Sequence, residues 1–281
     1  MTRRYLEIDV FGAESVRLSG NPVGVILDSA GLDTADMQRF ARWTNFSETT
    51  FLMPAEHPDA DYKVRIFTPT MELPFAGHPT LGSCFAWLSQ GFRPKSSNIR
   101  VIQECGIGLV PILIQGEAQL SFSAPKLIRF GPVAPCVLDE IINILNIPSE
   151  LVVDAHWIDN GPGWIGVLLP SAADVLALRP QSQSKLNLGV FGPYEPGCQF
   201  AYEVRAFFSE GGTLVEDPVC GSLNASGAQW LVSSNRFRPP YMVSQGLAIG
   251  RNGQISVTKD ENEHLWVGGR VATVATAEVE L

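Results

Sequence analysis

The chain has 281 residues, of which 45% are hydrophobic and 17% charged, and its formal net charge is −9. This length exceeds the usual single domain of about 100–150 residues, so two domains or lobes are expected. An acidic chain with no cluster of Lys or Arg argues against nucleic acid or anionic membranes as partners. Glu7 and Asp9 interrupt the apolar segment that a signal peptide would need, and no apolar stretch approaches about 20 residues. The sequence therefore predicts a cytoplasmic protein.

The cysteines and the familiar short motifs give no sign of a metal or cofactor. Cys84, Cys105, Cys136, Cys198 and Cys220 are scattered and form no C-x-x-C pair, so neither a disulfide framework nor a zinc site is expected. Four of them are interpreted as buried packing residues, and Cys220 belongs to a motif described below. The sequence also lacks an H-x-x-x-H pair, a glycine-rich phosphate fingerprint and a G-x-S-x-G motif.

The first predicted elements are strands and one helix. Residues 6–10 alternate apolar and polar side chains, which indicates a strand, and residues 23–27 predict a second strand after a turn. Apolar positions recur at helical spacing over residues 34–44. The β-branched and aromatic residues at 49–52 predict a further strand, with Glu48 at its entry.

Two distant stretches of the chain share one pattern. In the first, V-R-x-F at residues 64–67 is followed by E-x-P-x-x-G at 72–77 and a helix-like run rich in small residues. In the second, V-R-x-F at 204–207 is followed by E-x-P-x-x-G at 216–221 and a similar run. The match predicts an internal duplication, in which each half forms strands around a central helix and a cleft separates the halves.

In each half, the predicted helix begins at the last glycine of the motif, Gly77 or Gly221. Pro79 suits a first helical turn, and Ser222 or Asn224 could cap the second helix. The first amides of a helix have no internal partner and lie at the positive end of its dipole, so each turn is a candidate anion site. Two such turns facing each other would hold a substrate carboxylate and stabilise charge that develops during proton abstraction. The alternative is two capped helices packed in a core.

His78 follows the first of these glycines directly. A lone histidine is usually structural, but a position at a helix entry near Glu72 makes His78 a candidate substrate ligand or proton carrier. His57, His156 and His264 have no such context and are left unassigned.

Several segments together resemble the signature of the PhzF-like family, named for phenazine biosynthesis. They are G-N-P at residues 20–22, N-F-S-E-T-T-F at 45–51, E-L-P-F-A-G-H-P at 72–79, E-D-P-V-C-G-S at 216–222, Q-G at 245–246 and V-G-G-R at 267–270. The resemblance spans nearly the whole chain. It implies the α+β, diaminopimelate epimerase-like fold, in which two pseudo-symmetric lobes each have a mostly antiparallel sheet around a central helix, and it implies a homodimer. The lobes are expected at 1–118 with the C-terminal strand 271–281, and at 119–270.

The resemblance also implies a function. The type member of the family moves a proton between carbons of a dihydro-hydroxyanthranilate. Carried onto matching positions, the general acid/base is Glu48, the other catalytic residues are His78 and Asp217, and the substrate-binding residues are Gly77, Gly221, Ser222 and Cys220. The expected function is a cofactor-independent isomerase or epimerase acting on a small, carboxylate-bearing anionic metabolite, with no metal.

Cys220 departs from the family pattern and leaves alternatives open. Many members have a small hydroxyl or apolar residue there, whereas the related diaminopimelate epimerases and proline racemases have one cysteine of a thiol pair. A thiol-assisted amino-acid racemase is therefore a second hypothesis. Cys220 aligns with Ala76 in the repeat, which argues against a symmetric pair, although a single cysteine at a helix N-terminus could assist as a second acid. A non-catalytic ligand-binding protein on the same fold is the third.

Overall fold

The computed structural model describes residues 1–95 and 99–281, which form two compact units. The first unit comprises residues 1–123 and 268–281, and the second comprises residues 124–267. In the first unit, the amino group of Met1 donates to the carbonyl of Leu281 at 2.6 Å, so the two ends of the chain meet. Among the described residues, no helix is both long and apolar enough to span a bilayer.

The first unit is a sheet that closes on itself. Its elements are β1 (Thr2–Val10), β2 (Asn21–Ile26), α1 (Thr34–Thr44), β3 (Glu48–Met53), β4 (Tyr62–Phe67), β5 (Glu72–Leu73), α2 (Gly77–Ser89), β6 (Arg100–Cys105), β7 (Gly108–Ile114), β8 (Gln119–Ser123) and most of β17 (Leu265–Glu280). Antiparallel pairs join β17 to β1, β1 to β2, β3 to β4, β6 to β7 and β7 to β8. Parallel pairs join β2 to β3 and β4 to β6, and β8 pairs with β17 to complete the ring.

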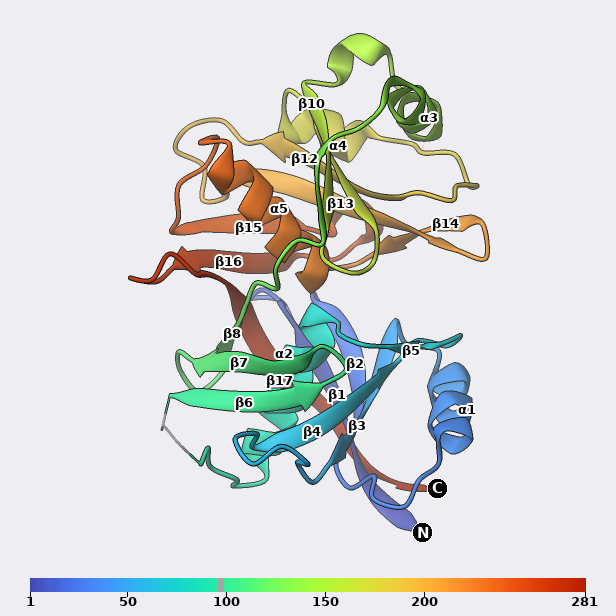
Figure 1. Cartoon of the computed structure of the whole chain (residues 1–281), viewed down its shortest axis with the longest axis vertical. Coiled ribbons are helices and arrows are strands. Elements are labelled where there is room, and N and C mark those ends of the chain that lie inside the picture. The colour runs from blue at the N-terminus through green and yellow to red at the C-terminus, as the bar shows by residue number, and fades with distance from the viewer. Residues whose placement is uncertain (96–98) are drawn as a thin grey trace. The chain divides into compact units, whose positions relative to one another are not determined.

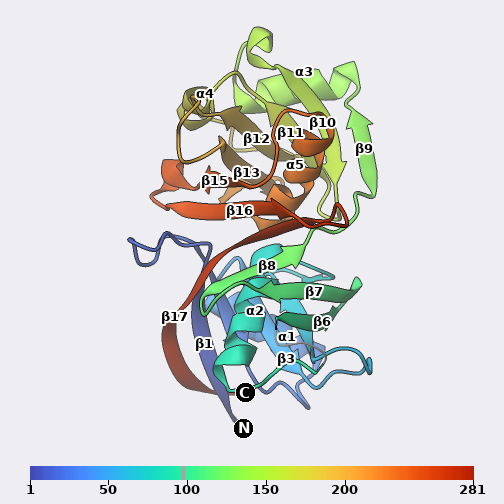
Figure 2. The ribbon, with the colours of Figure 1, turned by 90° about the vertical axis from the view of Figure 1, so that its left-hand side faces the viewer.

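The helix α2 runs through this ring (Figures 1 and 2). Every residue from Gly77 to Cys84 is buried, as are Ala86 and Trp87, which is the pattern of a helix surrounded on all sides. Gly82 lets the helix approach the sheet closely, because a Cβ there would lie 2.4 Å from Cγ1 of Val23. The small residues of this helix therefore allow the surrounding strands to pack closely against it.

The second unit repeats this arrangement of strands. Its elements are β9 (Arg129–Pro132), α3 (Pro135–Leu145), η1 (Ser149–Leu151), β10 (Asp154–Asp159), β11 (Trp164–Leu168), α4 (Ala172–Ala177), β12 (Asn187–Pro193), β13 (Tyr202–Glu210), β14 (Thr213–Asp217), α5 (Gly221–Ser233), β15 (Tyr241–Gln245), η2 (Leu247–Ile249) and β16 (Gly253–Lys259). Neighbouring strands pair in the order β9, β10, β11, β12, β13, β15 and β16. This order, and the parallel or antiparallel direction of each pair, match β17, β1, β2, β3, β4, β6 and β7 of the first unit. β14 pairs with β13 as β5 pairs with β4. The expected fold class is confirmed, with α5 as the buried central helix.

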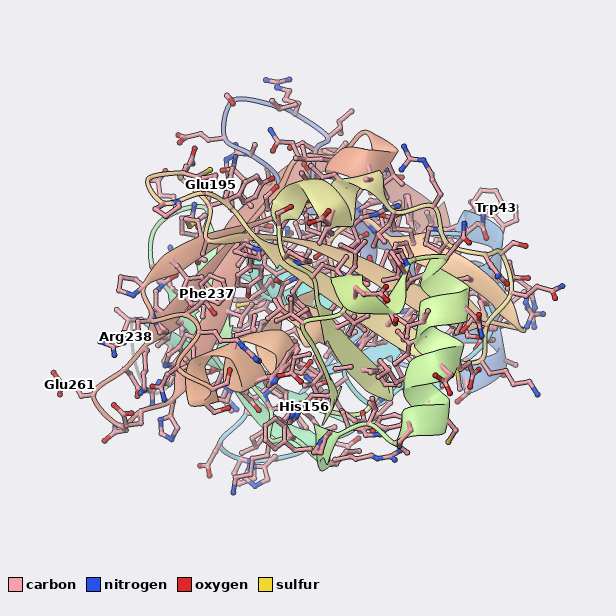
Figure 3. All side chains as sticks on the ribbon, turned by 90° about the horizontal axis from the view of Figure 1, so that it is seen from above. Trp43, His156, Glu195, Phe237, Arg238 and Glu261 are labelled. Carbon is pink, nitrogen blue, oxygen red and sulfur yellow. The ribbon has the colours of Figure 1, made fainter. Side chains whose placement is uncertain are left out.

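Shorter helices cover the outside of each unit. In the first unit, α1 packs Met37, Phe40 and Ala41 against the sheet, and its Trp43 projects outward with 81% of its surface exposed (Figure 3). In the second unit, α3 and α4 enclose an outer apolar cluster that includes Ile141 and Val175.

The expectation that four cysteines are buried is wrong for two of them. Cys84 and Cys105 are buried, whereas Cys136 and Cys198 are exposed free thiols. Cys136 lies in the first turn of α3, which packs only one side on the unit, and Cys198 lies in the turn between β12 and β13. Position on an outer element thus overrides the general preference of cysteine for burial.

We expect Gly82→Val to lower the free energy of unfolding by about 2 kcal/mol or more, because the new side chain would overlap Val23 inside the closed sheet. Urea denaturation followed by circular dichroism measures this change. Gly116→Ala is the matched control, since its Cβ would meet nothing closer than 3.9 Å. Equal losses in both variants would contradict the close packing of α2.

Candidate active site

Glu48 and His78 lie side by side in the first unit, although 30 positions separate them in the sequence. Glu48 begins β3, where the parallel pairing with β2 sets it opposite Val23, and His78 is the second residue of α2. Nε2 of His78 lies 3.4 Å from Oε2 of Glu48, and the two side chains are only 3% and 13% exposed. A carboxylate and an imidazole therefore share one sheltered place.

Burial keeps the His78 ring neutral. Desolvation lowers the pKa of His78 from 6.5 to about 3, against the opposing effect of the Pro22 carbonyl. Nδ2 of Asn21 lies 3.3 Å from Nδ1 of the ring. A neutral imidazole carries hydrogen on one nitrogen and a lone pair on the other, so His78 can orient a carboxylate without fixing a positive charge beside it. The G-N-P segment thus contributes a contact to the site that its turn-forming composition did not indicate.

Buried hydroxyl and amide groups fasten α2 to the strands around it. Oγ of Ser83 donates to Oγ1 of Thr50 on β3 at 2.9 Å. Nε2 of Gln103 on β6 donates to Oγ1 of Thr80 at 2.9 Å, and Gln103 accepts from Tyr62. These bonds fix the helix that carries His78 relative to the strand that carries Glu48. The sequence alone does not reveal these bonds, since an isolated Thr, Ser or Gln carries no signal of its partner.

Gln245 ties the second turn together. Its Oε1 accepts from the amide of Cys220 at 3.1 Å, and its Nε2 donates to the carbonyl of Asp217 at 3.1 Å. Nδ2 of Asn224 donates to the same Oε1 at 2.8 Å and to the carbonyl of Cys220 at 2.8 Å. Asn224 was a candidate cap by sequence, but it lies inside α5 and bonds backward to the residue before the helix.

Ser222 is held by Asn160, in the loop after β10, and by Trp164, the first residue of β11. Nε1 of Trp164 donates to Oγ of Ser222 at 3.0 Å, and Nδ2 of Asn160 donates to its carbonyl at 2.9 Å. Ser222 was the other candidate cap, but Cys220 occupies the N-cap position of α5 and its side chain makes no capping bond. The Ser222 oxygen thus accepts from Trp164, and its other hydrogen-bond contact is with Sγ of Cys220 at 3.4 Å.

The thiol of Cys220 is buried and protonated. Burial, followed by the nearby Asp217 carboxylate, raises the pKa of Cys220 well above its ordinary value. Its Sγ lies 3.4 Å from Oγ of Ser222. A thiol with a raised pKa supplies little thiolate, so Cys220 is poorly suited to remove a proton from carbon. Ala76 holds the equivalent N-cap position of α2 and has no thiol.

Both central helices begin in the same way. Ala76 and Cys220 have extended backbone conformations, and neither makes a side-chain capping bond within the part of the chain that the structure describes. Gly77 and Gly221, the first helical residues, are buried. That these two starts bind an anion stays a prediction. That both serve one substrate stays a prediction.

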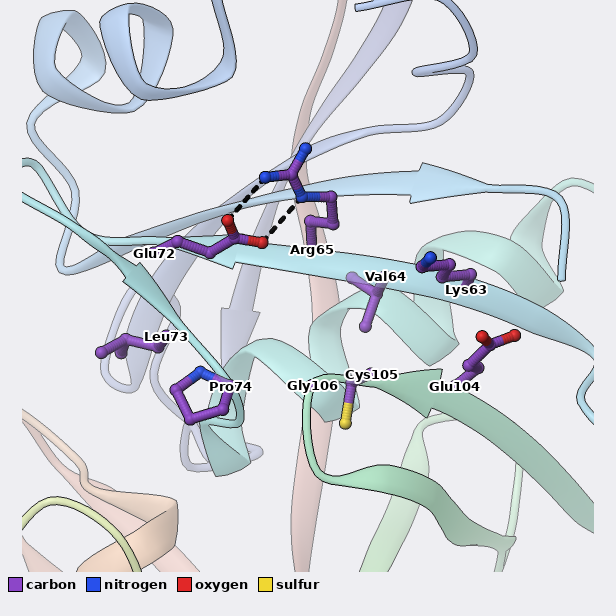
Figure 4. A pocket seen from close by; sticks show the side chains of 9 residues that line it. All are labelled: Lys63, Val64, Arg65, Glu72, Leu73, Pro74, Glu104, Cys105 and Gly106. Atoms are coloured by element: carbon purple, nitrogen blue, oxygen red, sulfur yellow. Dashed lines mark hydrogen bonds and ion pairs between the residues drawn. The ribbon is translucent and has the colours of Figure 1, made fainter. Parts of the chain in front are cut away.

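A cavity of about 490 Å³ lies elsewhere on the first unit (Figure 4). It opens where β5 and β6 pair with different parts of β4, and its lining does not include Glu48 or His78. The lining residues are Lys63, Val64, Arg65, Glu72, Leu73, Pro74, Glu104, Cys105 and Gly106.

The charged groups of this cavity already have partners. Arg65 pairs with Glu72, Lys63 pairs with Glu56 at 2.6 Å, and Glu104 accepts from the amides of Glu56 and His57. With these charges satisfied, the sheltered Glu48 and His78 are the better candidate for chemistry. Within the described ranges, no group of three or more His, Cys, Asp or Glu residues is placed to hold a metal ion.

Comparison with known proteins shows the family to which the chain belongs. Residues 8–277 match the PhzC-PhzF family, described as phenazine biosynthesis-like protein. The chain is similar to antisense-enhancing sequence 1 of Schizosaccharomyces pombe, with 38% identity covering 96% of each chain. It is 33% identical to a trans-2,3-dihydro-3-hydroxyanthranilate isomerase of Pseudomonas fluorescens, over 88% of this chain and 87% of that protein. A Bacillus anthracis PhzF-family protein has the same fold, with a TM-score of 0.82, 23% identity and full coverage of both chains.

We expect the buried, neutral His78 to make stability depend on pH. Its folded-state pKa of about 3 lies below the ordinary 6.5, so the unfolded chain takes up the proton first as pH falls. The contribution of His78 is thus fully present above about pH 6.5 and is lost progressively toward pH 3. Urea denaturation across this range should show a shallower pH dependence for His78→Gln than for the wild type. Equal slopes would mean that the ring is not held neutral.

Proposed function

Because the chain belongs to the phenazine biosynthesis-like (PhzC-PhzF) family, we propose that it is a cofactor-independent isomerase or epimerase with Glu48 as its general acid/base. The relatives named as isomerases support the reaction class, including one that matches most of both chains. The observation that carries the residue assignment is the sheltered contact between Glu48 and His78. The substrate is a small metabolite that bears a carboxylate.

One carboxylate can carry out both halves of the reaction. Glu48 takes a proton from one carbon of the substrate and returns it to another, so that the enzyme ends in its starting state. Proton transfer by a positioned side chain contributes a rate factor of about 10²–10⁴. His78 is 3.4 Å away and neutral, so it orients the carboxylate while leaving its basicity available. This division of roles needs no group from outside the chain.

The helix starts supply the electrostatic part of the mechanism. Removing a proton from carbon leaves negative charge on the substrate, and amides at the start of α2, beginning at Gly77, stabilise such charge. In the second unit, Asp217 orients the substrate and Gly221, Ser222 and Cys220 bind it. The Ser222 hydroxyl can donate its one hydrogen to a substrate carboxylate while its oxygen still accepts from Trp164. The homodimer expected for the family is part of this proposal.

We expect Glu48→Gln to fold and bind ligand but to lose solvent deuterium incorporation by about 10²-fold or more, because the amide cannot carry the proton. The probes are trans-2,3-dihydro-3-hydroxyanthranilate and a panel of small hydroxy and amino acids in D₂O, followed by NMR. Glu56→Gln, which removes an exposed carboxylate of the same unit, is the control. Unchanged exchange in Glu48→Gln would remove Glu48 from the mechanism. A wild-type protein stabilised by a probe that it never exchanges would instead be a binding protein.

Cys220→Ser should retain most of the deuterium exchange, because its thiol is protonated and Ala76 provides no second thiol. The measurement is the exchange rate on the same probes, with the melting temperature to verify folding. A near-complete loss of exchange in a folded Cys220→Ser protein would favour the thiol-assisted racemase.

A further inference from the structure

An arginine and a glutamate form the same two-bonded ion pair in both units. Nε and Nη2 of Arg65 donate to the two carboxylate oxygens of Glu72 at 2.7 and 2.5 Å (Figure 4). The corresponding atoms of Arg205 donate to Glu216 at 2.9 and 2.7 Å. Such bidentate pairs fix the relative orientation of both side chains as well as their distance.

Each pair joins the two strands that lead into a central helix. Arg65 and Arg205 lie on β4 and β13, and the glutamates lie on β5 and β14, which pair antiparallel with them. Glu72 and Glu216 each stand five positions before the glycine that starts the helix. In each unit, the ion pair therefore holds the strand just before the turn, β5 or β14, against its neighbour, β4 or β13.

Both arginines make further contacts that hold them in place. Nη2 of Arg65 donates to Oγ1 of Thr34 at the start of α1. Nη1 of Arg205 donates to the carbonyls of Val175 and Leu178 at the end of α4, where a positive charge also favours the helix dipole. Each guanidinium lies over the phenylalanine two positions along its strand, at 5.1 Å in the first unit and 4.8 Å in the second.

We propose that the Arg205–Glu216 pair is a positioning pair for Asp217, and that Arg65–Glu72 plays the same part for the first turn. Glu216 and Asp217 are consecutive on β14, so their side chains point to opposite faces of the strand. Fixing Glu216 on one face by Arg205 therefore fixes the direction of Asp217 on the other. This inference rests on the proposed function, in which Asp217 orients the substrate.

The two pairs differ in burial, which ranks their expected effects. The side chains of Arg205 and Glu216 are 6% and 13% exposed, whereas those of Arg65 and Glu72 are 22% and 38% exposed. Water can replace a lost partner at an exposed pair, but a buried charge left alone has no such substitute. The second pair should thus constrain its turn more strongly than the first.

The test compares Arg205→Lys, Glu216→Gln and Glu72→Gln with Asp36→Asn, which removes the exposed Arg39–Asp36 ion pair as a control. Arg205→Lys keeps the positive charge but loses the planar fork. We expect amide hydrogen exchange of residues 217–222, measured by mass spectrometry, to speed up about tenfold in both second-unit variants through local opening. Glu72→Gln should have a smaller effect, at residues 73–78, and Asp36→Asn none at either turn.

Turnover separates positioning from a merely structural role. At a temperature where every variant is folded, kcat of the two second-unit variants should fall about tenfold or more, with a smaller change in KM, because small misplacements of a reacting group are costly. Unchanged kcat in folded Arg205→Lys, or faster amide exchange spread evenly over the second unit, would overturn the proposal. If Glu216→Gln does not fold, Arg205→Lys decides alone. Wild-type protein that turns over no probe would contradict the proposed function, while the amide measurement would still decide whether the pair holds the turn.

Discussion

The enclosure of α2 by strands, in which every residue from 77 to 84 is buried, is the constraint on which the first unit depends. A helix buried in this way cannot rotate or slide unless the strands around it move, because protein interiors are close-packed. Gly82 brings α2 onto the sheet, and Ser83 bonds it to Thr50. The direction of His78 is therefore set by the whole ring, as is its contact with Glu48. The same reasoning applies to α5, which is buried along most of its length.

The two units share one backbone plan, as the predicted duplication requires, but their side chains differ. The first turn has an imidazole beside a carboxylate, whereas the second brings together a hydroxyl and a thiol. Cys105 holds the place on β6 that Gln245 holds on β15, by the matching registers of these strands with β4 and β13. The first unit thus has a cysteine where Gln245 bridges the turn of the second unit with its two hydrogen bonds. The two halves thus share the helix start and differ in the side chains around it.

Local patterns in the sequence predicted much of the fold, including the helix at residues 34–44 and both central helices. The repeated motifs also indicated which residues begin those helices. The contact between Glu48 and His78 could not be read in this way, because it depends on the register of β3 with β2 and on the path of α2. The bonds of Trp164 and Gln245 were missed for the same reason, since contacts between distant segments leave no local period. Burial of a lone cysteine such as Cys136 depends likewise on the face that packing selects.

The ring of the first unit is interrupted in sequence by the entire second unit. Its strands β1 and β8 both need β17 as a neighbour, and the part of β17 in this unit lies after residue 267. A ribosome releases residues 124–267 before it releases that strand, so the second unit has its full set of residues earlier. During synthesis, the ring of strands that carries Glu48 therefore cannot close between β1 and β8 until translation of β17 is finished.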